Sequence, residues 1–133
     1  MADCYEGFVT EVVLYKDRDN AVTVIPYSDL PNRVNYDMTA VTRVVANADL
    51  ITSLAVGDSI VGDSDVTQAV FWNDDTIING VAQWRIYCKV GLFTGIVAGE
   101  YTLRITVFDP DHPNGLVLPG SDEFLHIIIK DLP

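Results

Sequence analysis

The sequence predicts an all-β fold in which short antiparallel strands form a sandwich. Short runs rich in β-branched and aromatic residues recur along the whole chain, and Gly, Pro, Asn and Asp separate them. No apolar pattern with a helical period persists for three turns. Residues 82–93 and 100–108 alternate between apolar and polar side chains, as half-buried antiparallel strands do. About eight or nine strands at this spacing are typical of an antiparallel sandwich.

The first half of the chain contains strand-like runs of uneven clarity. Residues 7–15 and 21–25 are expected to pair across a polar turn. Pro26 should end the second of these strands because proline has no N–H to donate to a ladder. Residues 33–46 indicate one or two strands, whereas residues 47–61 fit either a short helix or a weak strand.

The pattern is more regular after residue 65. Residues 66–72 are expected to form a strand that ends at a turn over Asp74 and Asp75. A short strand over residues 76–78 then leads to Asn79-Gly80. This dipeptide favours a type I′ hairpin because Asn and Gly tolerate positive φ at both central positions.

The two alternating segments predict the core. The side chains expected to point inward from them are Trp84, Ile86, Cys88, Val90, Tyr101, Leu103, Ile105 and Val107. A long turn over residues 109–115 should follow, and then a short strand over residues 116–118. Residues 123–130 form the expected final strand, with Leu125, Ile127 and Ile129 inward.

The composition indicates one globular domain over residues 1–133. Hydrophobic residues make up 49% of the chain and charged residues 20%, so a core can form without disulfides or a metal. Eight Lys and Arg against 19 Asp and Glu give a formal net charge of −11. Such a surface repels phosphate groups, which excludes nucleic acid and anionic membranes as expected partners.

The beginning of the chain has no recognisable export signal. Met1 to Glu6 contain two acidic residues and no basic segment followed by an apolar one, and no later stretch reaches the roughly 18 apolar residues of a spanning helix. We therefore expect synthesis in the cytoplasm without a signal peptide. Cys4 and Cys88 are then expected to be reduced thiols, with Cys88 in the core.

No enzyme motif is recognisable. The chain lacks G-x-S-x-G, H-E-x-x-H, P-loop and dinucleotide-binding patterns, and it has only two histidines. His112 lies beside Asp109 and Asp111 in a proline-rich segment, which could form a metal or acid/base cluster, although a solvated turn is the simpler interpretation. We expect a protein that is not an enzyme and has no cofactor.

The best candidate for a metal site is a group of three acidic residues. Asp58, Asp63 and Asp65 cluster around Gly62, and Ca²⁺ prefers several oxygen ligands on a loop. The segment lacks the residue order and the distal Glu of an EF-hand. The near-repeat VGDSIVGDS also fits two polar turns around an apolar pair, so we expect no metal.

Four residues are candidates for contacts with another protein. Trp72 ends a predicted strand beside the polar residues Asp74 and Asp75, and a Trp in this position can anchor an interface. His126 alternates with the inward positions of the last strand, so its side chain should face solvent or a neighbouring subunit.

Two segments carry a resemblance to known proteins. Residues 99–109, GEYTLRITVFD, followed by a turn with Gly115 and a closing strand, resemble the penultimate strand of immunoglobulin-like sandwiches. In those folds a Tyr near the start of this strand bonds to the backbone through its hydroxyl, and Tyr101 is the candidate. Residues 37–41, DMTAV, precede an early strand, and the order of the two segments resembles small immunoglobulin-like sandwich proteins of bacteriophage particles over residues 20–130.

The resemblance implies an antiparallel immunoglobulin-like β-sandwich that serves as a non-enzymatic structural protein of a phage virion. Such a protein would bind other virion proteins, in many symmetric copies, as a capsid-decorating or cementing subunit or as a connector of tail, neck or fibre parts. A homo-oligomer is compatible with this role, and the protein would reside in the virion. The alternative is a carbohydrate- or receptor-binding β-sandwich module, for which the sequence shows no local aromatic platform.

Overall fold

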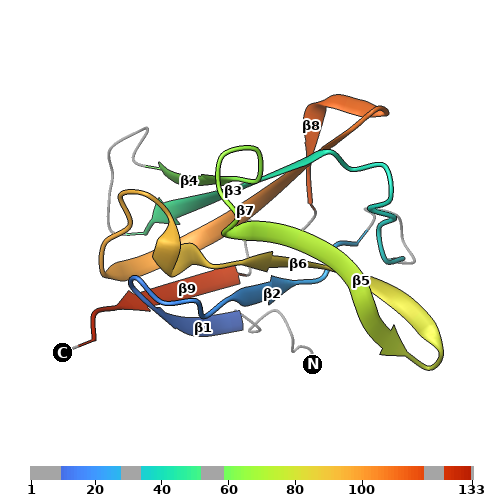
Figure 1. Ribbon diagram of the computed structural model, residues 1–133. Helices are drawn as coiled ribbons and strands as arrows, with labels where there is room; N and C mark the ends of the chain where they lie inside the picture. The colour runs from blue at the N-terminus through green and yellow to red at the C-terminus, as the bar shows by residue number, and fades with distance from the viewer. Residues whose placement is uncertain (1–9, 28–33, 52–58, 119–124, 133) are drawn as a thin grey trace, which may run out of the picture.

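The fold consists of two packed β-sheets (Figure 1). The computed structural model describes residues 10–27, 34–51, 59–118 and 125–132. The prediction of an all-β sandwich is confirmed for this part of the chain. Its helical content is the single 3₁₀ turn η2 (Val90–Leu92), and within the described residues no helix has the length and apolarity to cross a membrane.

The larger sheet is built around one long strand. Its strands are, in spatial order, β1 (Thr10–Tyr15), β9 (Leu125–Lys130), β7 (Gly99–Asp109), β3 (Arg43–Leu50) and β4 (Ser59–Asp63). The strand β8 (His112–Val117) also pairs with β7. One edge of β7 pairs with β3, and the other edge is divided between β9 and β8. The pairing of β1 with β9 is parallel, and the other pairs of this sheet are antiparallel.

The smaller sheet has three strands in the order β2 (Val22–Val24), β6 (Val81–Cys88) and β5 (Val70–Ile78). Both pairs are antiparallel. The pairing of β2 covers only the end of β6 from Ile86 to Cys88. The β5–β6 hairpin therefore continues beyond the part that β2 covers, and it extends away from the sandwich in Figure 1.

The core lies between the sheets and follows the alternation of the strands. Side chains of β7 at Tyr101, Leu103, Ile105 and Val107 are buried, and those between them are half-exposed. The predicted inward face of β7 is confirmed. On β6 the prediction holds for Ile86 and Cys88, and the same inward series ends at the buried Val90 of η2. Trp84 differs, because it is only partly buried and packs against the margin of the core.

Tyr101 joins the start of β7 to the loop before it. Its hydroxyl donates to the carbonyl of Val97 at 2.7 Å and accepts from the Val97 N–H at 3.2 Å. The ring is 1% exposed. The backbone bond expected of this hydroxyl is confirmed, and it satisfies a polar group that burial would otherwise leave unpaired.

The β5–β6 hairpin confirms one predicted turn and corrects another. Asn79 and Gly80 have φ values of 52° and 79°, as a type I′ turn requires. The turn predicted at Asp74 and Asp75 is wrong, because β5 continues through both residues. A register shift between Asn73 and Thr76 accommodates one extra residue there, so the polar pair marks a β-bulge inside a strand.

The β7–β8 hairpin is tighter than predicted. Residues 110 and 111 form the turn, and β8 begins at His112, where the sequence predicted a long turn to residue 115. Asp109 pairs with His112 across this turn. Of the strand predicted over residues 116–118, the first two residues are therefore the end of a longer strand, and Leu118 lies just beyond it.

The early strands were predicted less well. The expected pairing of residues 7–15 with residues 21–25 is wrong, because β1 pairs with β9 in the larger sheet and β2 pairs with β6 in the smaller one. The segment at residues 33–46 contributes an isolated bridge between Tyr27 and Asn35 and then the beginning of β3. Residues 47–50, whose structure the sequence left open, complete β3, and β4 begins at Ser59. The predicted strand over residues 66–72 begins later, at Val70. Residues 7–9 and 123–124 of the predicted terminal strands lie outside the described part.

Gly62 lies within β4 and is buried, although the sequence predicted a turn at this position. A Cβ atom here would lie 2.3 Å from the ring of Phe93. The glycine therefore allows the Phe93 ring to pack directly on the β4 backbone. The other half of the near-repeat, Gly57-Asp58, lies outside the described residues.

Replacing Leu103 with Ala should destabilise the fold by about 2–5 kcal/mol, because the fully buried side chain would leave a cavity between the sheets. Val61→Ala on β4 is the control, since the Val61 side chain is 48% exposed and its truncation should change stability by less than about 0.5 kcal/mol. Urea unfolding measures both. Equal stability of the two variants would show that the inward face of β7 is assigned incorrectly.

Candidate functional site

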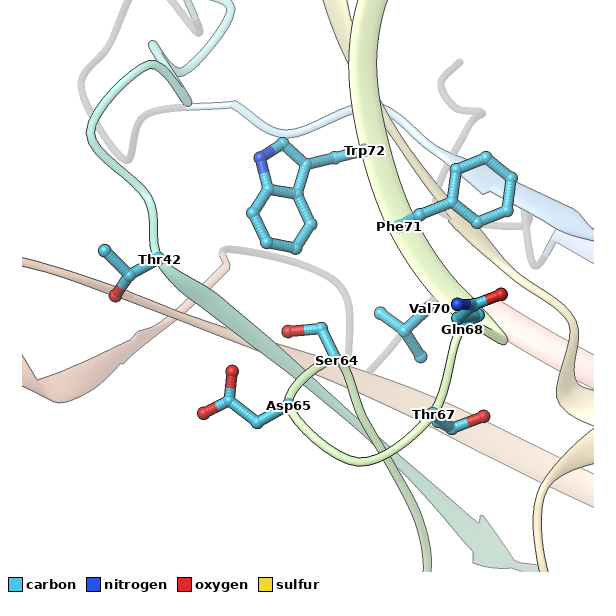
Figure 2. A pocket seen from close by; sticks show the side chains of 8 residues that line it. All are labelled: Thr42, Ser64, Asp65, Thr67, Gln68, Val70, Phe71 and Trp72. Carbon is cyan, nitrogen blue, oxygen red and sulfur yellow. The ribbon is translucent and has the colours of Figure 1, made fainter.

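A cleft opens where the β4–β5 connection meets the beginning of β5 (Figure 2). Its volume is about 510 Å³, which is within the range of small-molecule sites. The residues that line it are Thr42, Ser64, Asp65, Thr67, Gln68, Val70, Phe71 and Trp72. The sequence singled out Trp72 and Asp65 for different reasons, and the fold brings both to this cleft.

Strand alternation explains how Trp72 enters the cleft. Phe71 and Trp72 are consecutive on β5, so their side chains leave opposite faces of the strand. Phe71 stacks on Tyr87 at the outer face, with ring centroids 5.0 Å apart. Trp72 packs partly against the core. Figure 2 shows its indole opposite Thr42 and Ser64.

The polar wall of the cleft is held by short-range hydrogen bonds. Ser64 Oγ accepts from the Val44 N–H at 2.9 Å, and Thr67 Oγ1 accepts from the Ala69 N–H at 3.1 Å. The Ser64 hydroxyl keeps its own proton for donation. In the described part of the chain, the indole N–H of Trp72 has no hydrogen-bond partner within the protein.

An ion pair lies next to the cleft. Arg43 contacts both carboxylate oxygens of Asp63, at 3.0 and 2.5 Å, and its Nε lies 3.6 Å from the Asp65 carboxylate. The hydrogen bonds from Arg43 lower the pKa of Asp63 below its ordinary value. The Arg43 guanidinium also lies 4.9 Å from the ring centroid of Phe108.

The ion pairs of Arg43 involve acidic residues that the sequence offered as candidate calcium ligands. Two of them, Asp63 and Asp65, are neighbours around Arg43, and Asp58 lies outside the described residues. Over the ranges that the structure describes, no three His, Cys, Asp or Glu side chains are arranged to hold a metal ion. The acidic pair visible in the structure is thus arranged around a protein cation.

The β5–β6 hairpin beyond residue 72 forms a projecting arm, which we define as residues 73–85. Asp74 and Asp75, two of the predicted interaction residues, lie exposed at its bulge. Near its tip, Ile77 is 61% exposed and Val81 is 57% exposed. Apolar side chains at a hairpin tip gain nothing from the core, which makes this arm a candidate contact surface.

The base of the arm is held by one side chain. Asn35 accepts from the Trp84 N–H at 2.8 Å and donates to the carbonyls of Trp84 at 3.2 Å and of Pro26 at 3.1 Å. Its amide therefore pairs with β6 as a neighbouring strand would, immediately beyond the end of β2. The sequence offered no signal for this contact, because 49 residues separate Asn35 from Trp84.

His126, the fourth predicted interaction residue, lies apart from the arm and the cleft. It belongs to β9 of the larger sheet, half-buried, opposite Thr102 of β7 and Glu11 of β1. The interaction residues predicted from the sequence therefore form two groups: Trp72, Asp74 and Asp75 on β5, and His126 on the other sheet.

A second polar cluster lies at the β7–β8 turn. The Tyr36 hydroxyl donates to Asp109 at 2.5 Å, and His112 Nδ1 lies 2.9 Å from the other Asp109 oxygen and 3.3 Å from the Tyr36 hydroxyl. Asp109 and His112 do meet, as the proline-rich segment suggested, but Asp111 is exposed and Tyr36 takes the third place. Burial and the hydrogen bond to Asp109 raise the pKa of Tyr36 to about 12.

Cys88 is fully buried in the core, where burial raises the pKa of its thiol to about 12. A thiol that stays protonated and inaccessible is a poor nucleophile. Cys4, its possible partner, lies outside the described residues.

Comparison with known protein families, with characterised proteins and with solved structures finds no match to this chain.

The Tyr36 cluster predicts a specific pH dependence of stability. Hydrogen bonds, first from Tyr36 and then from His112, lower the pKa of Asp109 in the folded state. The ionised Asp109 therefore stabilises the fold above the unfolded pKa of about 3.9, and this contribution is lost as the pH falls through the lower folded value. Asp109→Asn should accordingly lose less unfolding free energy than the native protein between about pH 7 and pH 2.

Urea unfolding at the two pH values measures this difference. Tyr36→Phe is the matched variant, because it keeps the carboxylate and removes the main donor, so its pH dependence should be intermediate. An Asp109→Asn variant with the same pH dependence as the native chain would contradict the assignment.

Proposed function

We propose that this chain is an immunoglobulin-like sandwich that acts as a non-enzymatic structural protein of a phage virion. It binds other virion proteins in many copies, as a capsid-decorating or cementing subunit or as a connector of tail, neck or fibre parts. The observation that carries the protein-binding role is the projecting β5–β6 arm with its exposed apolar tip. The resemblance of residues 20–130 to small phage sandwich proteins supports the virion as the location.

The order of the strands supports the immunoglobulin-like assignment. In variable-type immunoglobulin domains the strands B, E and D form one sheet, and G, F, C and C′ belong to the other. The smaller sheet, β2-β6-β5, corresponds to B, E and D, and the order β9-β7-β3-β4 in the larger sheet corresponds to G, F, C and C′. With this assignment the letters also follow one another along the chain. The Tyr101 bond at the start of β7 fits the tyrosine corner of strand F. The strand β8, inserted between β7 and β9, is an addition to that scheme.

The chemistry of the arm indicates how it would bind. Ile78 lies opposite Val81 and Ile77 opposite Ala82, so apolar side chains project from both faces of the tip. Among the described strands, none pairs with Val81–Gln83 on the edge away from β5. An open edge next to apolar side chains suits docking by strand addition.

The charge near the arm indicates which kind of partner surface it would contact. The exposed Asp74 and Asp75 lie at the bulge below the tip, in a chain with a net charge of −11. A complementary partner would offer an apolar groove with basic residues at its rim. Such complementarity would guide association and exclude acidic surfaces.

Ile77→Asp should abolish or weaken binding of the purified chain to phage particles that lack it, by at least about tenfold, because a carboxylate would be buried against the apolar groove. Val66→Asp is the control, since Val66 is an 83% exposed apolar residue in the β4–β5 connection, outside the arm. Co-sedimentation with the particles measures the number of bound copies. Saturable binding of the native chain and of Val66→Asp, with loss for Ile77→Asp, is expected.

Two outcomes would count against the proposal. Absence of saturable binding to any deficient particle would remove the virion role. Undiminished binding of Ile77→Asp would leave a structural role possible at another surface and exclude the arm as its contact.

A further inference from the structure

We infer that the cleft around Trp72 is a binding site for a neutral saccharide. This inference goes beyond the proposed virion role and does not depend on it, because it concerns the isolated chain. The cleft combines one aromatic face with several hydrogen-bonding groups in a volume of about 510 Å³. A sugar ring has the complementary pair of properties, since its C–H face is apolar and its edge carries hydroxyls.

The aromatic wall is suitable for stacking. The indole of Trp72 is partly buried against the core and lines the cleft together with Thr42 and Ser64 (Figure 2). A ring held in this way has little conformational entropy left to lose when a ligand stacks on it. Its N–H has no hydrogen-bond partner among the described residues and can donate to a sugar hydroxyl.

The polar wall offers both donors and acceptors. The Asp65 carboxylate is 61% exposed and can accept from two neighbouring hydroxyls at once. The Ser64 hydroxyl, whose oxygen already accepts from Val44, still has a proton to donate. Thr42 adds a hydroxyl whose hydrogen bond to the Phe108 carbonyl is long at 3.5 Å.

The charge of the cleft favours a neutral ligand over a cation. An indole and a carboxylate together could also hold a lysine or arginine side chain. Here, however, the Arg43 guanidinium lies 3.6 Å from Asp65 and already compensates part of its charge. A second cation at Asp65 would be repelled by Arg43, whereas sugar hydroxyls would not.

The test is an NMR titration of the ¹⁵N-labelled full chain with glucose, galactose, mannose, N-acetylglucosamine, maltose and lactose, each up to about 50 mM, since an open cleft suggests dissociation constants on the order of 1 mM. Sorbitol is the ligand control, because it has hydroxyls without a ring face. We expect at least one sugar to shift the Trp72 indole N–H and the amides of Thr42 and Asp65 in a saturable manner. Sorbitol should not.

Variants locate the site. Asp65→Asn should weaken the binding of that sugar at least about tenfold. Asp74→Asn is the matched control, since it removes one negative charge in the same way. Asp74 is exposed on β5 and does not line the cleft. Thr42→Val removes a hydroxyl at an exposed position with little change of shape and should weaken binding to a smaller degree, which provides a second measurement if Asp65→Asn perturbs the fold.

Three results would overturn the inference. They are the absence of saturable shifts with every sugar, equal shifts with sorbitol, and saturable shifts of the same resonances by arginine amide alone. Sugar binding that is unchanged in both Asp65→Asn and Thr42→Val would likewise overturn the assignment to this cleft.

Discussion

The alternation of β7 is the constraint on which the rest of the fold depends. Its inward side chains, from Tyr101 to Val107, are almost completely buried, and both of its edges are paired. A register slip of one residue would turn this whole row towards solvent, so the register with β3 is strongly specified. The positions of β3 and β9 follow from that register. The larger sheet is therefore organised by one strand.

In the smaller sheet, β2 pairs with only one end of β6, so the rest of the β5–β6 hairpin forms the projecting arm. β2 ends at Val24 while β6 extends five residues beyond the last pair, from Ile86 back to Val81. A two-stranded ribbon on its own is only marginally stable. The Asn35 amide compensates at its base by occupying the edge of β6 at Trp84. The bulge at Asp74 and Asp75 adds twist that directs the ribbon away from the sheet.

Local signals predicted the parts of the fold that depend on local physics. The alternation of residues 100–108 and the Asn79-Gly80 turn were predicted because period and turn conformation are properties of a few adjacent residues. The bulge at Asp74 and Asp75 was mistaken for a turn, because acidic residues favour turns and only the register with β6 distinguishes the two.

The sites were harder to predict, because they join distant segments. Trp72 and Asp65 could be selected as single residues, but their common cleft requires the spatial order of β3, β4 and β5. Arg43 and Tyr36 were missed, since their partners lie 20 and 73 residues away and strand order cannot be deduced from one sequence. The contacts of Asn35 with β6 and of Tyr36 with Asp109 could not be predicted from the residue types alone.

These two adjacent residues each form hydrogen bonds with a different hairpin. Asn35 holds the base of the β5–β6 arm at Trp84, while Tyr36 holds the β7–β8 turn through Asp109. The pKa shifts fit a structural tie, since Tyr36 stays protonated up to about pH 12 and the Asp109 pKa is lowered, so the donor and the acceptor keep their roles near neutral pH. The bond between Tyr36 and Asp109 therefore ties the β7–β8 turn to the segment whose neighbouring residue, Asn35, holds the base of the arm.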